Sequence, residues 1–546
     1  MNFSHFTFDN RFINNLPADP EANVFSRQVE KAAYSFVNPT KVKAPQLVAV
    51  SNDVAAMIGF NEDELTSTNF SDVFGGNQLI AGMHPFAMCY GGHQFGQWAG
   101  QLGDGRAINL GEVVTQNHGH QTLQLKGAGA TPYSRTADGL AVLRSSIREF
   151  LCSEAMFHLG VATTRALSLC LTGEHVVRDM FYDGNAKPEQ GAVVCRVSSS
   201  FMRFGSFQLP ASRGDSHLLK QLVEHCIKSD FPHLLVNKPM EGSSKGKSEE
   251  NNSDFDQSVY LAWFNEVCTR TCSLMVNWMR VGFVHGVMNT DNLSIIGETI
   301  DYGPYGWIDN FDLHWTPNTT DAQGRRYRFG AQAEISQWNL FQLANAIYPL
   351  IGEPEPLQKI LDDYAVSYQK QWQKMMAEKL GFEALQPDDG ELFINLEQLL
   401  STVETDMTIF YRQLAKIKTA DDNHVQTDWL EFFSRCYYQT AQLDDDYQQS
   451  LTSWMTIYLK RLTKQTTDDN LRSSAMNKVN PKYVLRNYLA QQAITAAEQG
   501  DFSEIHRLQK IMLTPYDEQI EFEQYAEKRP EWARNQAGCS MLSCSS

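Results

Sequence analysis

Two short segments, HGVMNTDN at residues 285–292 and DYG at residues 301–303, decide how this chain is interpreted. Asn292 lies seven residues after His285, and Asp301 follows Asn292 by nine residues. Asparagine and aspartate side chains supply oxygen atoms that hold Mg²⁺ beside nucleotide phosphates. The spacing therefore predicts that Asn292 and Asp301 are metal ligands in a site that handles a nucleotide.

The same spacing is found in protein kinases, where H-R-D-L-x-x-x-N is followed by D-F-G. One position departs from the kinase pattern. The kinase base lies two residues after the histidine, and here that residue is Val287, which cannot accept a proton. Either the protein is inactive, or its phosphate chemistry is arranged around the carboxylate of Asp291.

Composition limits the class of protein. A chain of 546 residues with 42% apolar residues is expected to form two lobes with extensions. The net charge of −18 argues against a nucleic-acid surface. We find no apolar window long enough to span a membrane and no N-terminal targeting pattern, so we expect a cytoplasmic protein. Ten cysteines are too few for a disulfide scaffold.

The polar stretch 240–258 predicts a flexible insertion that divides the chain. Before it, alternating segments predict strands at 106–114 and 121–126, and helical spacing predicts a helix at 140–159. After it, helical patterns dominate, at 259–280, 335–350, 356–380, 428–463 and 481–499, with a short hairpin at 293–300.

These elements predict an α+β fold of the protein-kinase-like, two-lobed type. A smaller mixed α/β N-terminal lobe with the nucleotide-binding elements would occupy residues 1–239. A larger, mainly helical lobe with the catalytic and metal-binding loops would occupy residues 259–480. A helical extension with a cysteine-containing tail would occupy residues 481–546. The order of lobes is that of kinases, although likeness of fold alone does not establish function.

The first lobe contains residues suited to phosphate binding. The glycine-rich run 91–106 would let backbone amides approach phosphate oxygens, although a structural loop would read the same way. Lys126 ends a predicted strand, and Glu149 lies in the following helix, where it could orient the lysine. The alternative is that Arg144 and Arg148 are the neighbours of Glu149.

Arg196 and Arg203 lie in apolar surroundings and are expected to be partly buried. Buried arginines need anionic partners, which would be either phosphate groups or carboxylates of the chain itself. We interpret Cys268 and Cys272 as core residues and not as metal ligands, because no second Cys/His pair follows at zinc spacing. His285 is interpreted as a structural, hydrogen-bonding histidine.

Many segments of the chain resemble the selenoprotein O family, whose bacterial members are the YdiU proteins. The resemblance extends over nearly the whole chain, in 8–12, 16–20, 83–112, 126–129, 138–139, Glu149, 285–306, 480–483, 486–488, 530–533 and 544–546. It implies a kinase-like fold that binds ATP in a reversed orientation. It also implies transfer of AMP, instead of phosphate, to hydroxyl side chains of protein substrates, which accounts for the missing kinase base.

The resemblance also implies roles for individual residues. Asp291 matches the proton acceptor of the family, and Asn292 and Asp301 match its Mg²⁺ ligands. The nucleotide contacts are matched by Gly103, Gly105, Arg106, Lys126, Asp138, Gly139, Arg196 and Arg203.

We therefore expect a protein adenylyltransferase that uses ATP and Mg²⁺, with Mn²⁺ and uridylyl transfer as variants. Its partners would be proteins that present Ser, Thr or Tyr hydroxyls, and neither a nucleic acid nor a membrane is expected. We expect a monomer. Two alternatives stay open: a kinase that transfers the γ-phosphate, and an inactive nucleotide-binding scaffold. Retention of Lys126, Asn292 and Asp301 favours an active enzyme.

The tail raises a separate question. Cys544 stands where animal members of the family carry selenocysteine, and relatives are thought to tether this tail to a cysteine near the metal-binding aspartate. Residues 301–336 contain no cysteine, so any redox partner would be another thiol, such as Cys539. The alternative is an incidental thiol in a frayed terminus.

Overall fold

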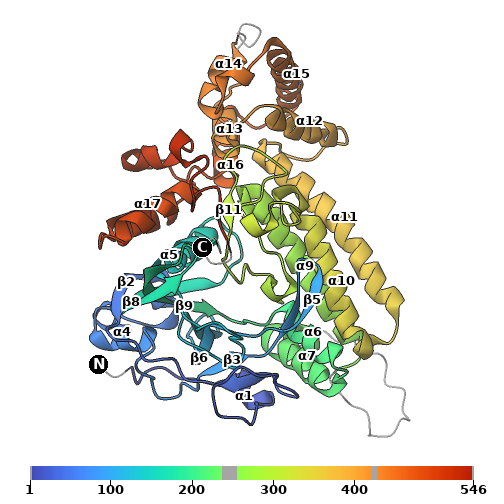
Figure 1. Ribbon diagram of the computed structural model, residues 1–546. Coiled ribbons are helices and arrows are strands. Elements are labelled where there is room, and N and C mark those ends of the chain that lie inside the picture. Colours follow the sequence, from blue (N-terminus) through green and yellow to red (C-terminus); the bar gives the residue numbers. More distant parts are fainter. Residues whose placement is uncertain (1–2, 181–182, 237–254, 420–426, 544–546) are drawn as a thin grey trace.

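The structure is a computed structural model, and it describes residues 3–180, 183–236, 255–419 and 427–543. Its centre is a seven-stranded antiparallel sheet with the strand order β1-β3-β6-β7-β9-β8-β2 (Figure 1). The strands are β1 Tyr34–Phe36, β2 Gln46–Val50, β3 Phe86–Met88, β6 Ala107–Val114, β7 His120–Lys126, β8 Arg165–Arg178 and β9 Lys187–Ser198. The strands predicted at 106–114 and 121–126 are confirmed as β6 and β7.

Both faces of the sheet are buried, as β9 shows. Ala192 and Val194 pack in one core with helix α5, Leu143–His158, whereas Val193 and Cys195 pack in a second core on the opposite face. Successive side chains of a strand point to opposite faces, so this alternation follows directly from the sequence. Helix α5 confirms the helix predicted at 140–159, and α17 and α18 lie beside it (Figure 1).

The remaining α-helices of the described residues occur before, between and after the strands of the sheet in the sequence. Their bounds are α1 Arg11–Asn15, α2 Asn52–Ile58, α3 Glu62–Leu65, α4 Thr68–Phe74, α6 Phe204–Ser212, α7 Ser216–Asp230, α8 His233–Val236, α9 Gln257–Val281, α10 Gln332–Ile351, α11 Pro354–Lys379, α12 Asp389–Thr402, α13 Met407–Leu414, α14 Trp429–Phe432, α15 Asp445–Leu462, α16 Asp469–Val479, α17 Asn487–Ala497 and α18 Ser503–Met512. Helix α9 shows how the sequence sets such bounds. The carboxylate of Asp256 accepts from Val259 N at its start, and Gly282 ends it with φ of 76°.

Helices α9, α10 and α11 confirm the helices predicted at 259–280, 335–350 and 356–380. They share a core with α6 and α7, which precede the insertion in the sequence. Helices α12 to α16 form another core, at the top of Figure 1. The fold is thus a mixed α/β arrangement with one large antiparallel sheet and many helices.

Three predictions need correction. The segment 293–300 is not a hairpin; Ser294 and Thr299 form isolated bridges to Arg203 and Thr163, because the apolar residues of the segment pack separately into the core of α9. The helix predicted at 428–463 is interrupted, since the side chain of Asp444 caps a new helix, α15. The helix predicted at 481–499 begins only at Asn487.

Two small sheets position the loops singled out by the sequence. Strands β10, Phe283–Val284, and β11, Gly306–Trp307, pair antiparallel, with Phe283 opposite Trp307. This pairing brings the loop 285–292 beside residues 301–303. Strands β4, Gly91–Gln94, and β5, Gln97–Gln101, form a hairpin from the glycine-rich run.

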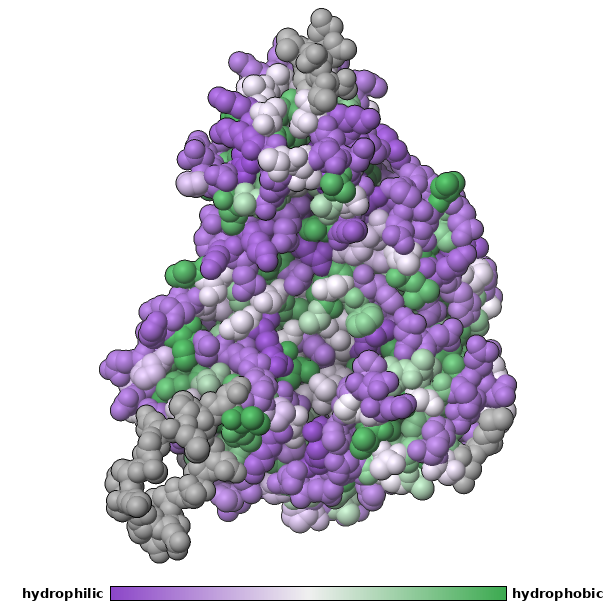
Figure 2. Space-filling view, turned by 180° about the vertical axis from the view of Figure 1, so that it is seen from behind, coloured by the Kyte–Doolittle hydropathy of each residue, from purple (hydrophilic) through white to green (hydrophobic). Residues whose placement is uncertain are grey.

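Most of the predicted insertion lies outside the described residues, and α9 begins at Gln257, before the predicted end at residue 258. Among the helices in the described part of the chain, none is long and apolar enough to cross a membrane. On the face shown in Figure 2, hydrophilic residues cover most of the surface, and hydrophobic residues occur in small groups.

Candidate active site

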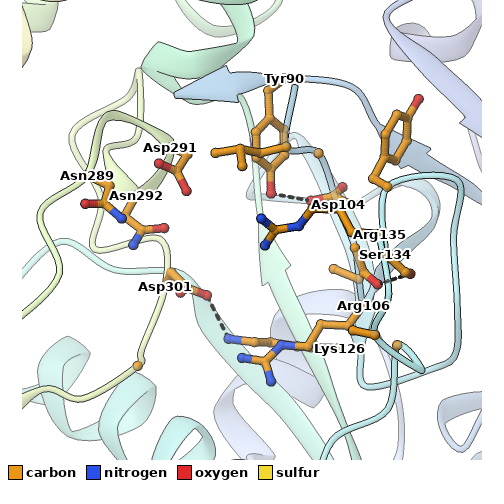
Figure 3. Close-up of a pocket in the computed structure, with 18 of the residues that line it drawn as sticks. Tyr90, Asp104, Arg106, Lys126, Ser134, Arg135, Asn289, Asp291, Asn292 and Asp301 are labelled. Carbon is orange, nitrogen blue, oxygen red and sulfur yellow. Dashed lines mark hydrogen bonds and ion pairs between the residues drawn. The ribbon is translucent and has the colours of Figure 1, made fainter. Parts of the chain in front are cut away.

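A pocket of about 700 Å³ lies where β6, β7 and β9 meet the loops 285–292 and 301–304. The structure brings all eleven sequence-predicted site residues to its lining: Gly103, Gly105, Arg106, Lys126, Asp138, Gly139, Arg196, Arg203, Asp291, Asn292 and Asp301. Figure 3 shows Asp291, Asn292 and Asp301 on one side of the pocket, facing Arg106 and Lys126 on the other. Residues that are almost two hundred positions apart in the sequence therefore form one site.

Lys126, the last residue of β7, forms two ion pairs at the pocket. Its Nζ atom lies 2.7 Å from Glu149 Oε2 and 2.7 Å from Asp301 Oδ1. Glu149 projects from α5, so the predicted pair between a strand-end lysine and a helix glutamate is confirmed. Desolvation alone would raise the pKa of Asp301, but the charges of Lys126 and Arg196 outweigh it and lower this pKa.

The alternative neighbours proposed for Glu149 have other partners. Arg144 forms an ion pair with Glu189 at 3.0 Å. Arg148 donates a hydrogen bond to the carbonyl oxygen of Tyr305 at 2.7 Å. Glu149 is therefore left to Lys126 and to one further arginine from β9.

That arginine is Arg196, of which only 1% is exposed. Its Nη1 atom lies 3.2 Å from Glu149 Oε1 and 3.4 Å from Asp301 Oδ1, and it donates to Ile300 O at 2.9 Å. Its Nη2 atom also donates to the side chain of Gln124. The sequence left phosphate groups and internal carboxylates open as partners of Arg196. The structure shows internal carboxylates as partners, and Arg196 also lines the pocket.

Arg203 occupies a different environment. Its Nη1 atom donates to the carbonyl oxygen of Asp291 at 2.8 Å, and its Nη2 atom lies 3.9 Å from Asp104 Oδ1. The guanidinium group stacks over the ring of Tyr90, with Cζ 4.8 Å from the ring centroid. Arg203 therefore braces the loop that carries Asp291 while keeping one edge at the pocket.

Asp291 is buried, with 8% exposed, in the short 3-10 turn Thr290–Asn292. Its Oδ2 atom accepts from Gln94 Nε2 at 3.4 Å, and its Oδ1 atom has no hydrogen-bond partner among the described residues. Burial raises the pKa of Asp291 to about 6, against the opposing charge of Arg203. A buried carboxylate oxygen without a partner is unusual, because leaving it unsatisfied costs free energy.

The glycine-rich run packs against this carboxylate. A Cβ atom on Gly92 would lie 2.6 Å from Asp291 Oδ1, so a side chain there would collide with it. His93 N donates to Thr290 Oγ1 at 2.7 Å, and Phe95 N donates to Asn289 Oδ1 at 3.1 Å. The first half of the run is therefore a structural hairpin over the loop 285–292.

The second half of the run lines the pocket through Gly103 and Gly105. Gly103 has φ of 89°, and a Cβ atom there would lie 2.4 Å from the ring of Tyr133. Only glycine fits such a position without strain. The backbone of this turn can thus approach a bound molecule closely, as the sequence suggested for phosphates.

The donor set of Asn292 and Asp301 fits a magnesium ion. Asn292 Nδ2 donates to Val287 O at 3.0 Å, which leaves the carboxamide oxygen to face the pocket. A carboxylate and a carboxamide supply hard oxygen ligands, and Mg²⁺ is commonly held by one or two such side chains plus waters and phosphates. No group of three or more His, Cys, Asp or Glu residues that could hold a metal occurs in the described residues, so a metal held by Asn292 and Asp301 would take its other ligands from waters or phosphates.

Several pocket residues were missed by sequence reasoning. Arg178 forms an ion pair with Asp138 at 2.6 Å and lines the pocket with Arg135 and Tyr90. Arg178 is forty residues from Asp138, at the end of β8, and no local pattern indicates it. Asp104 was detectable, because it lies between two glycines that were selected.

The residues interpreted as structural do lie in the core. His285 is 1% exposed, and burial lowers its pKa to about 4. Cys268 and Cys272 are buried. Cys539 is buried as well, and burial raises its pKa to about 11, which makes it a poorer redox partner than the sequence suggested. Cys544 lies outside the described residues.

Comparison with known proteins places these observations in a family. Residues 22–513 match the family described as "Protein adenylyltransferase SelO". The chain belongs to this family. It is therefore a nucleotidyltransferase enzyme, and the expectation drawn from the sequence is confirmed at this level.

Individual SelO relatives are similar over their whole length. The chain is 56% identical to "Protein nucleotidyltransferase YdiU" of Rhodopirellula baltica over 548 residues, covering 99% of each chain. It is 55% identical to the protein of the same name from Azoarcus sp., again over 99% of each chain. Its identity to the Flavobacterium johnsoniae protein is 50%, over 98% of this chain and 99% of the relative.

Proposed function

We propose that this SelO protein transfers AMP from ATP to Ser, Thr or Tyr hydroxyls of protein substrates and releases pyrophosphate. The observation that carries the proposal is the carboxylate of Asp291. It lines the pocket next to Asn292 and has an oxygen without a hydrogen-bond partner in the described residues. It would take the place of a base that Val287 cannot provide. The SelO family description and the names of the YdiU relatives support nucleotidyl transfer.

The transfer step follows from this arrangement. The substrate hydroxyl oxygen would attack the α-phosphorus of ATP while Asp291 accepts the hydroxyl proton. The bond between the α-phosphorus and the oxygen that bridges to the β-phosphorus would break, and pyrophosphate would leave with that electron pair. Arg203, which holds the backbone of Asp291, would keep the carboxylate in position during the step.

Asn292 and Asp301 would hold Mg²⁺, or Mn²⁺, which supplies positive charge against the phosphates when bound. Lys126, Arg196 and Arg203 would contact the phosphates, and they are supported in this role by their place at the pocket lining. Their side chains carry cationic donors suited to phosphate oxygens.

The same pocket is also lined by the other predicted contacts: Gly103, Gly105, Arg106, Asp138 and Gly139. We propose that they bind the remainder of a nucleotide that lies in the reversed orientation relative to kinases. The chain would then be organised as a kinase-like pair of lobes at 1–239 and 259–480, with the insertion at 240–258 and the extension at 481–546.

ATP labelled at one chosen phosphate tests this proposal. The protein is incubated with candidate substrates and ATP that is labelled at either the α- or the γ-phosphate, and intact mass is measured. Label from the α-phosphate and a mass gain of one AMP are expected. Label from the γ-phosphate would instead indicate a kinase, and no label on any protein, with ATP bound, would indicate a scaffold. UTP with Mn²⁺ provides the parallel test for uridylyl transfer.

A further inference from the structure

Aromatic side chains are exposed beside the catalytic loop. Phe95 at the tip of the β4–β5 hairpin is 36% exposed, Trp98 on β5 is 39% exposed, and Phe341 on α10 is 44% exposed. The ring of His93 joins them to α10, because its centroid lies 5.0 Å from that of Trp98 and 5.5 Å from that of Trp338. Contiguous exposed apolar surface commonly marks an interaction site.

Helix α10 extends this surface. Trp338, Phe341, Asn345 and Tyr348 are spaced by three, four and three residues, which places them on one face of the helix. Phe341, Asn345 and Tyr348 are exposed, whereas the opposite side of α10 packs in the core of α9 and α11. Only Asn345 is polar in this row of four. Helix α10 thus presents aromatic rings to solvent and an apolar face to the core. The exposed rings form apolar surface that the described residues do not bury.

Arg326 lies against the same surface, and Arg325 and Arg328 are close to it in the sequence. None of the three forms a salt bridge within 4.0 Å among the described residues, although the charges of Arg326 and Arg328 act on the carboxylate of Asp321 and the net charge of the chain is −18. The guanidinium group of Arg326 lies over the ring of Trp338 at 4.7 Å. It also lies against the hairpin tip, 3.4 Å from the position of a Cβ atom on Gly96. A cationic group without a salt bridge to the described residues therefore adjoins the aromatic one.

The surface is continuous with the catalytic carboxylate. Gln94, the residue before Phe95, donates to Asp291 Oδ2 at 3.4 Å. The ring of Phe95 lies 5.3 Å from that of Tyr327, which is flanked in the sequence by Arg326 and Arg328. The exposed hairpin tip is thus adjacent in the chain to the side chain that contacts Asp291.

We propose that these aromatic and arginine residues form a docking surface for the segment of the substrate protein that carries the hydroxyl. The inference rests on the proposed function. An apolar side chain of the substrate would pack on Phe95, Trp98 and Phe341. Aspartate or glutamate residues near the hydroxyl would pair with Arg325 and Arg328. The preferred substrates are therefore segments in which the hydroxyl is flanked by acidic residues and followed or preceded by an apolar one.

Binding is measured first, without catalysis, by fluorescence anisotropy. Short peptides have alanine in place of the hydroxyl residue and differ only in acidic or basic flanks. The parent protein should bind the acidic peptide more tightly by roughly 2- to 30-fold, the value of two exposed ion pairs, and the difference should shrink with added salt. Arg325→Glu/Arg328→Glu should reverse the preference. Lys460→Glu/Lys464→Glu, at exposed residues at and just beyond the C-terminal end of α15, makes the same charge change and should leave the preference unchanged.

The aromatic part is tested with single variants. Phe341→Ala and Trp98→Ala should each weaken binding of the acidic peptide by roughly tenfold, as truncation of a buried interface aromatic does. Ile457→Ala, at a residue that is 53% exposed on α15, is the matched control and should bind as the parent does. Arg325→Glu alone changes the charge at one exposed side chain, so this variant is expected to fold as the parent does.

Three results would overturn the inference. The first is equal affinity for acidic and basic peptides, and the second is an affinity for a single-stranded oligonucleotide equal to that for the acidic peptide. The third is a dimer of the parent protein that Phe341→Glu dissociates in sedimentation experiments, which would assign the surface to a second copy of the chain. Transfer to serine versions of the peptides is measured separately with α-labelled ATP. Acidic peptides that bind selectively but are never labelled would contradict the proposed function, whereas equal labelling of all peptides would contradict only the docking surface.

Discussion

Four charged groups of the pocket are paired with one another, whereas the carboxylate of Asp291 next to them is not. Lys126 and Arg196 share Glu149 and Asp301, two positive charges with two negative ones. Asp291 receives one long hydrogen bond from Gln94 and keeps a buried oxygen without a partner among the described residues. The paired groups hold each other in place, and the unpaired group keeps a lone pair for an incoming proton. The following predictions test that division.

The largest effect is expected at the point where the two regions meet. Asp301→Ala should abolish AMP transfer, because it removes a proposed metal ligand and the shared partner of Lys126 and Arg196. Asn292→Ala should weaken transfer strongly. Both are measured with α-labelled ATP at saturating Mg²⁺. A rate for Asp301→Ala within about tenfold of the parent, the loss expected for a supporting residue alone, would contradict the ligand role.

Removing the unpaired carboxylate should affect only the rate. Asp291→Ala should slow transfer by roughly 10²- to 10⁴-fold, the usual contribution of a general base, while ATP affinity stays near that of the parent. Rapid-quench kinetics and calorimetry separate the two quantities. Near-normal turnover in a correctly folded variant would remove Asp291 from the role of base.

The free energy of unfolding should depend on the paired carboxylate of Glu149 and not on the unpaired carboxylate of Asp291. Glu149→Gln leaves two cations with one anion, so the free energy of unfolding should fall by about 3 kcal/mol, as for a broken buried ion pair. Asp291→Asn removes a buried charge that has no ion-pair partner in the described residues, so stability should be equal or higher. Urea unfolding of both variants decides this. If both lose stability equally, the distinction between paired and unpaired carboxylates is wrong.

Nucleotide affinity should depend on the cations of the pocket. Lys126→Ala and Arg203→Ala should each weaken ATP binding by roughly 10- to 100-fold, the value of a hydrogen bond to a charged group. Lys359→Ala on the outer face of α11 is a matched control with no expected effect. Unchanged affinity in both pocket variants would assign these cations to internal pairing alone.

Glu298 lies between the paired and the unpaired carboxylates, because it has a hydrogen bond but no ion pair among the described residues. Its contribution should appear in the pH dependence of stability. It accepts one hydrogen bond from Ser198 at 2.7 Å, and burial raises its pKa to about 7, from the ordinary 4.5. The folded state therefore binds more protons than the unfolded state between pH 4.5 and 7, and stability should fall by up to about 3 kcal/mol as the pH rises through this window. Glu298→Gln should remove that part of the pH dependence. An unchanged slope in urea unfolding would contradict the raised pKa.

The sequence predicted individual site residues well, and it predicted contacts between distant residues less well. The spacing of His285, Asn292 and Asp301 indicated two loops of the candidate site, and all eleven selected residues line one pocket. Period-two and helical patterns located β6, β7, α5 and α9 to α11, because burial imposes those periods directly. Local pattern cannot report a contact between distant segments, which is why the ion pair of Arg178 with Asp138 was missed.

The errors have a similar cause. The run 293–300 has strand-like composition, yet its ends bridge to Arg203 and Thr163 and not to each other. For the glycine-rich run the sequence left a phosphate loop and a structural loop open, and the first half of the run contacts the loop 285–292 through hydrogen bonds to Asn289 and Thr290. In each case the partner was supplied by tertiary structure, which composition does not encode.

The last described residues of the chain connect two parts of the molecule. Leu542 N donates to Pro317 O at 3.0 Å and Thr319 N donates to Leu542 O at 2.8 Å, in the segment that follows the proposed metal-binding aspartate. The hydroxyl of the next residue, Ser543, donates to Met180 O at the end of the β8–β9 pair. A purification tag at the C-terminus would therefore be attached close to a point that is hydrogen-bonded to Pro317, Thr319 and Met180. Expression vectors for kinetic work should place the tag at the N-terminus instead.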